Sequence, residues 1–96
     1  MLATAADLQS MGRRLALVRR DYGEAIDLPE LDAASFANML GVPAKQYEQY
    51  ERGQAEPTAG FLIALRRKTG VSLDRLMDTE LPPPYRSLGW GYRIYR

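Results

Sequence analysis

Apolar residues recur at spacings of three and four along most of the chain, which is the period of an amphipathic α-helix. In the first segment Leu8, Met11, Leu15 and Val18 follow one another at spacings of 3, 4 and 3, and this predicts a helix over residues 4–22. Four shorter apolar segments follow, each bounded by a capping residue or a glycine. The pattern therefore predicts an all-α fold of five helices that cross at steep angles.

Capping residues and glycines set the expected helix boundaries. Thr4, with Asp7 three residues later, is a variant of the capping box that begins a helix. Gly23 is placed to end this first helix, because glycine is the commonest residue just beyond a helix C-terminus. The other four helices are expected from Asp32 to Gly41, over residues 44–51, from Thr58 to Gly70, and from Ser72 through Met77.

Residues 21–32 form an acidic segment that contains five carboxylates and no basic residue. Pro29 argues against one continuous helix through it. Two interpretations remain open for this segment. It is either a solvated acidic loop, or it serves as a partner surface or as a charge that repels nucleic acid.

Residues 81–96 differ in character from the rest of the chain. Three consecutive prolines are expected to be extended and stiff, and apolar residues then alternate with others, which suits a strand. We therefore expect a domain over residues 1–80 and an extended, strand-compatible C-terminal arm over residues 81–96. The arm is interpreted as a disordered basic end, as a dimerisation arm, or as an arm that contacts DNA or another protein. Its candidate contact residues are Trp90, Tyr92, Arg93, Ile94 and Tyr95.

Composition narrows the function classes. The chain of 96 residues contains no Cys and no His, which excludes disulfides and thiolate sites and removes the commonest general base and metal ligand. We therefore expect neither an enzyme nor a cofactor or metal site. No apolar run approaches 18 residues and the N-terminus lacks a signal pattern, so we expect a cytoplasmic protein with no membrane partner.

Net charge alone does not indicate a nucleic-acid partner, because 13 basic and 12 acidic residues give +1. Eleven of the basic residues are arginine, the side chain suited to phosphate and carboxylate recognition. Whether the chain can bind nucleic acid therefore depends on the distribution of its charges rather than on their sum.

A short turn, Leu40-Gly41-Val42-Pro43, joins two of the short helices. A turn of this length that contains glycine sets the second helix across the first at a steep angle. Such a pair can place its second helix in a DNA major groove while the N-terminus of the first faces a phosphate.

The residues around this turn resemble the XRE-like regulators, the phage repressor and Cro class of helix-turn-helix domains. The resemblance covers about residues 11–77. It rests on several motifs in order and spacing: Gly12, Leu15, Val18 and Arg19; Phe36, Ala37, Leu40, Gly41 and Val42; Glu51-Arg52-Gly53 with Pro57; and Ala64, Leu65, Gly70 to Asp74 and Leu76.

The resemblance implies an ion pair between Arg19 and Glu51 that ties the first helix to the end of the recognition helix. Tyr47 and Tyr50 stand where the family buries aliphatic residues. Their rings are expected to pack in the core while their hydroxyls find a partner, although direct contact with DNA is the alternative.

The resemblance also implies a transcriptional regulator of the repressor class that binds double-stranded DNA through the helix 44–51. Gln can bridge an adenine edge and Lys can reach guanine or phosphate. The position-by-position transfer predicts DNA contacts from Ala33, Ser35, Ala44, Lys45, Gln46, Glu48, Gln49, Arg52, Gln54 and Thr58.

This chain departs from the family pattern at three places: Asp32-Ala33 replaces the usual Thr-Gln or Ser-Gln, the preceding loop is longer and acidic, and Glu56 stands in a loop that is often basic. With few basic residues on the docking side, one half-site should bind weakly. A homodimer that engages two half-sites compensates for the weak binding of one domain.

The alternative to a DNA-binding regulator is a protein-interaction module on the same fold, such as the antitoxin of a toxin-antitoxin pair or an adaptor with weakened DNA binding.

Overall fold

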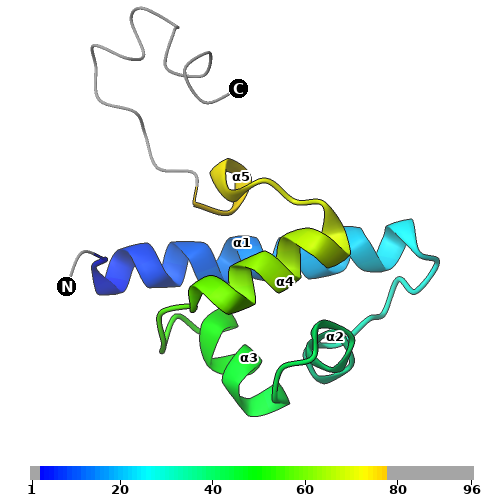
Figure 1. Ribbon diagram of the computed structural model, residues 1–96, viewed down its shortest axis with the longest axis horizontal. Coiled ribbons are helices and arrows are strands. Elements are labelled where there is room, and N and C mark those ends of the chain that lie inside the picture. The colour runs from blue at the N-terminus through cyan, green and yellow to red at the C-terminus, as the bar shows by residue number, and fades with distance from the viewer. Residues whose placement is uncertain (1–2, 78–96) are drawn as a thin grey trace, which may run out of the picture.

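The computed structural model describes residues 3–77 and contains five helices in this part of the chain, α1 (Ala5–Ala25), α2 (Ala33–Leu40), α3 (Ala44–Glu51), α4 (Ala59–Thr69) and α5 (Leu73–Met77). In Figure 1, α2 and α3 lie on one side of the long helix α1, α5 lies on the other, and α4 crosses α1 in front. The all-α, five-helix prediction is confirmed. The arm over residues 81–96, with its candidate contact residues, lies outside the described residues.

The predicted caps are present at four helix N-termini. Thr4 and Asp7 form a reciprocal capping box, in which each side chain accepts a hydrogen bond from the other residue's backbone N–H. The Asp32 carboxylate and the Thr58 hydroxyl cap α2 and α4, and the Ser72 hydroxyl accepts from the backbone N–H of Arg75. These side chains satisfy backbone donors that a helix cannot satisfy itself.

One predicted boundary is wrong. Gly23 does not end the first helix, which continues to Ala25. Gly23 lies inside the helix and is buried against the following loop. A Cβ there would lie 2.5 Å from the carbonyl oxygen of Leu28, so the glycine allows the loop to pack this closely. The acidic segment 21–32 is consequently half helix, and the loop proper begins after Ala25. Helix α3 covers Ala44–Glu51 as predicted, and Pro43 is its N-cap.

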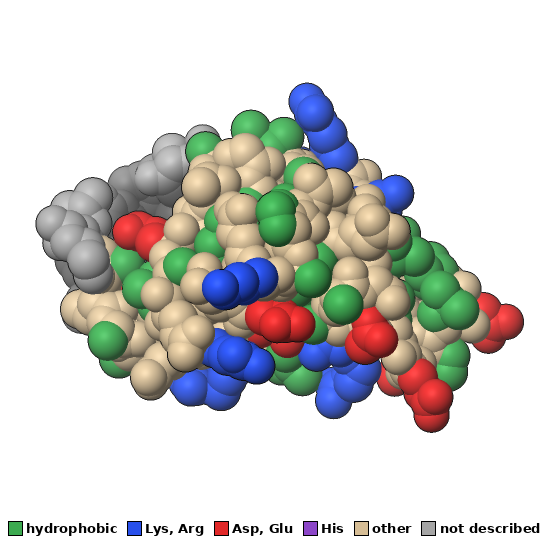
Figure 2. Space-filling model, turned by 90° about the horizontal axis from the view of Figure 1, so that it is seen from below, with side chains coloured by type: hydrophobic (Ala, Val, Ile, Leu, Met, Phe, Trp, Pro, Cys, Tyr) green, Lys and Arg blue, Asp and Glu red, His purple; other side chains and the backbone are tan. Residues whose placement is uncertain are grey.

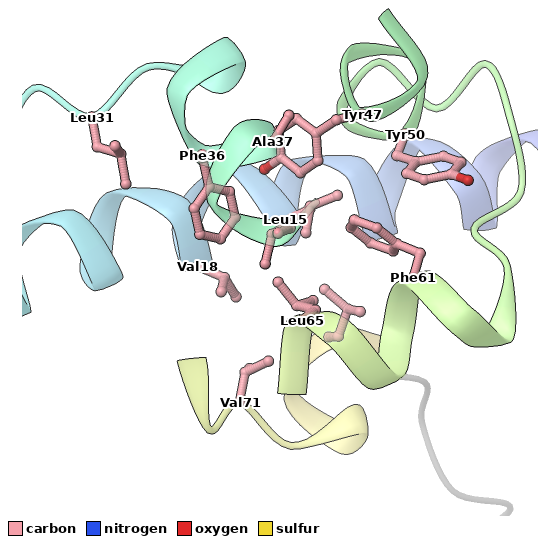
Figure 3. Close-up of a cluster of buried hydrophobic side chains, with 12 residues drawn as sticks. Leu15, Val18, Leu31, Phe36, Ala37, Tyr47, Tyr50, Phe61, Leu65 and Val71 are labelled. Carbon is pink, nitrogen blue, oxygen red and sulfur yellow. The ribbon is translucent and has the colours of Figure 1, made fainter. Parts of the chain in front are cut away.

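The core is a single cluster to which every helix contributes (Figure 3). Its centre is aromatic: the Phe36 and Tyr47 ring centroids lie 5.5 Å apart in an edge-to-face arrangement, and those of Tyr50 and Phe61 lie 4.7 Å apart. Such tilted pairs are preferred by aromatic quadrupoles. The buried residues of the cluster are Leu15, Val18, Leu31, Phe36, Ala37, Leu40, Tyr47, Tyr50, Phe61, Leu65, Val71 and Leu76.

Candidate nucleic-acid interface

The turn between α2 and α3 depends on Gly41. This residue has φ +78° and ψ +27°, in the left-handed region that glycine adopts without steric cost. The backbone N–H groups of Gly41 and Val42 donate to the carbonyl oxygens of Asn38 and Ala37, at 3.1 and 3.0 Å. The turn is therefore closed by its own backbone, which fixes the direction in which α3 leaves α2.

Helix α3 has one buried and one accessible face. Tyr47 and Tyr50, at 0% and 3% exposure, anchor it in the core, so the core-packing interpretation of these tyrosines holds. On the other face Lys45 is exposed, and Glu48 and Gln49 are partly exposed. The buried aromatic pair thus turns the polar side chains toward solvent.

The remaining predicted contact residues are not equivalent. Ala33 and Ala44 are partly buried and pack against the core cluster. Gln46 donates its side-chain N–H to the hydroxyl of Tyr50, and the hydroxyl of Thr58 accepts from the backbone N–H of Phe61 as an N-cap. The exposed members of the predicted set are Ser35, Lys45, Arg52, Gln54 and Thr58.

A carboxylate already occupies the N-terminus of α2. Asp32 Oδ1 accepts the backbone N–H of Ser35 at 2.7 Å, which is one of the amides that would otherwise be available to a phosphate. The hydrogen bonds from Ser35 hold the pKa of this exposed carboxyl below its usual value, with a smaller contribution from the positive charge of Arg19. Asp32 therefore stays negative at neutral pH where the family implies a DNA phosphate.

The face that carries α2 and α3 has mixed charge. Figure 2 shows basic and acidic side chains interleaved across it, without a continuous basic patch. Lys45 and Arg52 are exposed on or beside α3, whereas Glu30, Asp32 and Glu56 are exposed on the neighbouring segments. Electrostatic attraction to a polyanion is therefore weak on this face.

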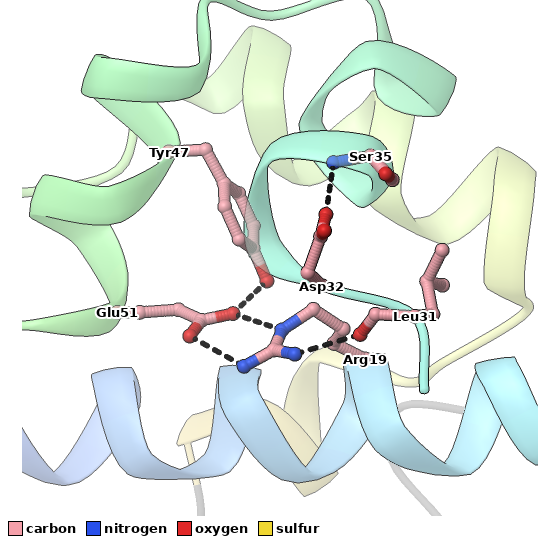
Figure 4. Close-up of polar contacts among 6 residues, drawn as sticks. All are labelled: Arg19, Leu31, Asp32, Ser35, Tyr47 and Glu51. Carbon is pink, nitrogen blue, oxygen red and sulfur yellow. Dashed lines mark hydrogen bonds and ion pairs between the residues drawn. The ribbon is translucent and has the colours of Figure 1, made fainter. Parts of the chain in front are cut away.

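Arg19 joins α1 to α3 and to the loop before α2 (Figure 4). Its guanidinium donates to both carboxylate oxygens of Glu51, from Nε at 2.7 Å and from Nη2 at 3.0 Å. Its Nη1 donates to the carbonyl oxygen of Leu31 at 2.8 Å, and the hydroxyl of Tyr47 donates to Glu51 Oε2. The bidentate pair implied by the resemblance is present, and it is part of a larger network than the sequence indicated.

Burial and hydrogen bonding stabilise one protonation state of each partner. The side chains of Arg19 and Glu51 are 23% and 13% exposed, and the hydrogen bond to Glu51 raises the pKa of Arg19. Burial, and then the bond to Glu51, raises the pKa of the Tyr47 hydroxyl far above its ordinary value near 10. The native state therefore requires a charged Arg19 and a neutral Tyr47.

We expect the free energy of unfolding to fall as the pH rises above about 10. The Tyr47 phenol then loses its proton in the unfolded chain while the folded chain retains it. The unfolded state is therefore stabilised relative to the folded state as the pH rises. One such proton contributes a slope of up to about 1.4 kcal/mol per pH unit. Urea denaturation between pH 8 and 11.5 measures the free energy of unfolding, which should fall less steeply with pH in Tyr47→Phe than in the wild type. Equal slopes would contradict the assignment to Tyr47.

Residues 3–77 contain no group of three or more His, Cys, Asp and Glu side chains placed to hold a metal ion. In the same part of the chain, no helix combines the length and the apolar character that crossing a membrane requires.

Comparison with known families agrees with the arrangement of these helices. Residues 30–76, from the loop before α2 to α5, match the profile of the family described as helix-turn-helix. No curated protein and no solved structure matches the chain significantly. The matched segment contains the Gly41 turn, both helices that it joins and the buried tyrosines of α3. The chain therefore contains a helix-turn-helix domain of the XRE-like class, the kind of domain that DNA-binding transcriptional regulators use.

Proposed function

We propose that the protein is a sequence-specific transcriptional regulator that inserts α3 into the major groove of double-stranded DNA. The observation that carries the proposal is the orientation of α3. Its two tyrosines are buried, its start is fixed by the Gly41 turn, and its polar face is accessible. A major groove admits one α-helix presented in this way.

Within this proposal three side chains of α3 read bases. Gln49 bridges an adenine edge, Lys45 reaches guanine or a phosphate, and Glu48 accepts from a cytosine amino group. Arg52 and Gln54, directly after the helix, contact the backbone and fix the register. Gln46 has its side-chain N–H on Tyr50, so we assign it a supporting role beside this set.

We further propose that two copies act together as a homodimer. The mixed charge of the α2–α3 face and the carboxylate at the start of α2 leave little attraction for phosphates, so one domain on one half-site should bind weakly. A linked second copy makes the second contact effectively intramolecular and raises the overall affinity without new contacts.

The double variant Lys45→Ala/Gln49→Ala tests the reading face. We expect specific DNA binding to weaken at least tenfold, which corresponds to about 1.4 kcal/mol, because a good base contact contributes roughly that much or more. The melting temperature should change little, since both side chains lie outside the core and point away from it. Fluorescence anisotropy at fixed salt measures the affinity, on a duplex selected from a random library.

Lys68→Ala is the matched control for charge. Lys68 is exposed in the last turn of α4, so its removal lowers the net charge equally and leaves α3 untouched. Equal losses in both variants would show that only net charge matters. Full affinity in the double variant would exclude α3 as the reading helix.

A second candidate function is supported by the start of α2. An exposed carboxylate at that position disfavours phosphate and suits a protein-interaction module on the same fold, such as an antitoxin or an adaptor. Selection from a random duplex library separates the two functions. A palindromic consensus supports the dimeric regulator, whereas no enriched sequence together with co-purification of one small protein supports the module.

A further inference from the structure

A hollow of about 430 Å³ lies beside the loop that precedes α2. Its volume is in the range of sites that hold a compact ligand or a few side chains. The loop supplies most of its lining and the outer side of α2 supplies the rest. The residues that line it are Leu28, Pro29, Glu30, Leu31, Asp32, Ser35 and Met39.

The floor of this hollow is held in place by the fold. The backbone N–H of Leu28 donates to the carbonyl of Gly23 at 2.7 Å, and that of Leu31 donates to the carbonyl of Leu28 at 3.1 Å. The Leu31 side chain is buried in the core, and its carbonyl accepts from Arg19. An occupant would therefore meet a preformed surface, which lowers the entropy cost of binding.

The walls combine apolar and acidic character. Leu28 is 47% exposed. Pro29 is exposed beside it, and Met39 is partly exposed. Glu30 and Asp32 add two exposed carboxylates, and the lining, which is composed of described residues, contains no Lys or Arg. This chemistry favours a segment that carries apolar or aromatic side chains together with positive charge, and it repels nucleic acid.

We infer that this acidic hollow binds the C-terminal arm of the same molecule. The arm, residues 81–96, carries Trp90, three tyrosines, Ile94 and three arginines, and has no acidic side chain. Its charge is opposite to that of the hollow, and its aromatic residues match the exposed leucine and proline and the partly exposed methionine of the lining. The inference goes beyond DNA binding and does not depend on it.

The length of the chain permits this contact. Trp90 lies thirteen residues after Met77, the last described residue, and this stretch spans at most about 43–47 Å when extended. The longest dimension of the described part of the chain is 41 Å. A neighbouring hollow of about 420 Å³ shares Pro29 to Asp32 but is also lined by Arg19 and Arg20, which would repel an arginine-rich segment. The first hollow is therefore the favoured site.

Trp90 provides a direct probe because it is the only tryptophan in the chain. We expect Trp90 of the full-length protein to emit at shorter wavelength than in a synthetic peptide of residues 81–96. Its quenching by acrylamide should be at least twofold weaker than in the peptide. The double variant Leu28→Ser/Glu30→Lys should bring both properties close to the peptide values, and 0.5 M salt should do so in part.

Ile63→Ser/Glu56→Lys is the matched control. It makes the same kinds of change at exposed positions that do not line the hollow, and it should leave Trp90 protected. Circular dichroism verifies that both variants remain folded. Quenching equal to that of the peptide in the wild type, or protection lost equally in both variants, would overturn the inference. Protection that disappears on dilution of the protein would also overturn it, because the arm would then be supplied by a second copy.

Discussion

Glu51→Gln is expected to lower the free energy of unfolding by about 3 kcal/mol, the lower end of the range for a buried ion pair, because this pair is partly buried and the substitution leaves the charge of Arg19 uncompensated. The carboxylate accepts two hydrogen bonds from Arg19 and one from Tyr47. A neutral amide can replace only part of this acceptor set, and it turns an N–H toward donors. For a domain of this size the loss corresponds to a fall in melting temperature of roughly 12–24 °C.

Urea denaturation at pH 7 measures the effect, with Glu56→Gln as the matched control. Glu56 is exposed, and the same substitution there should change the free energy of unfolding by less than about 0.5 kcal/mol. The double variant Arg19→Met/Glu51→Leu should be more stable than Glu51→Gln, because it removes both charges together. Losses of similar size for Glu51→Gln and Glu56→Gln would contradict the network described here.

Gly12→Ala is expected to destabilise the protein by about 2 kcal/mol. A Cβ at Gly12 would lie 2.3 Å from the carbonyl oxygen of Glu51 and 2.8 Å from that of Tyr50, so the backbones of α1 and α3 would have to separate. Overpacking of this kind costs about 1–3 kcal/mol or more. It outweighs the gain of up to about 1 kcal/mol that alanine brings to a helix interior.

The same substitution at Gly60 supplies the control with the opposite sign. Gly60 is exposed near the start of α4, and a Cβ there would come no closer than 3.9 Å to the side chain of Thr58. Gly60→Ala should therefore stabilise the protein by about 0.5 kcal/mol. Thermal and urea unfolding of both variants measure the difference, and a neutral or stabilising Gly12→Ala would show that α1 and α3 are not packed this closely.

The sequence predicted local features better than contacts between helices. Caps such as Asp32 and Thr58, and the left-handed turn at Gly41, depend on a few adjacent residues, and the structure contains all three. The end of α1 was wrong because Gly23 has a tertiary role: it allows Leu28 to approach. A glycine inside a helical pattern was the available signal of close packing.

The candidate interface was predictable in outline and less so in detail. The apolar spacing and the resemblance together indicated that Tyr47 and Tyr50 face inward. The bonds of Gln46 to Tyr50 and of Tyr47 to Glu51 depend on rotamers four residues apart on α3, which sequence spacing alone does not specify. The DNA-contact residues and the division at residue 80 remain predictions.

The three-way attachment of Arg19 has a consequence for kinetics. A single guanidinium fixes α3 and the loop before α2 to the same point of α1, so the direction of α3 is already set in the free protein. Under the proposed function, encounter with a cognate DNA site then requires no refolding, and discrimination between sites should appear mainly in how long each complex lasts rather than in how fast it forms.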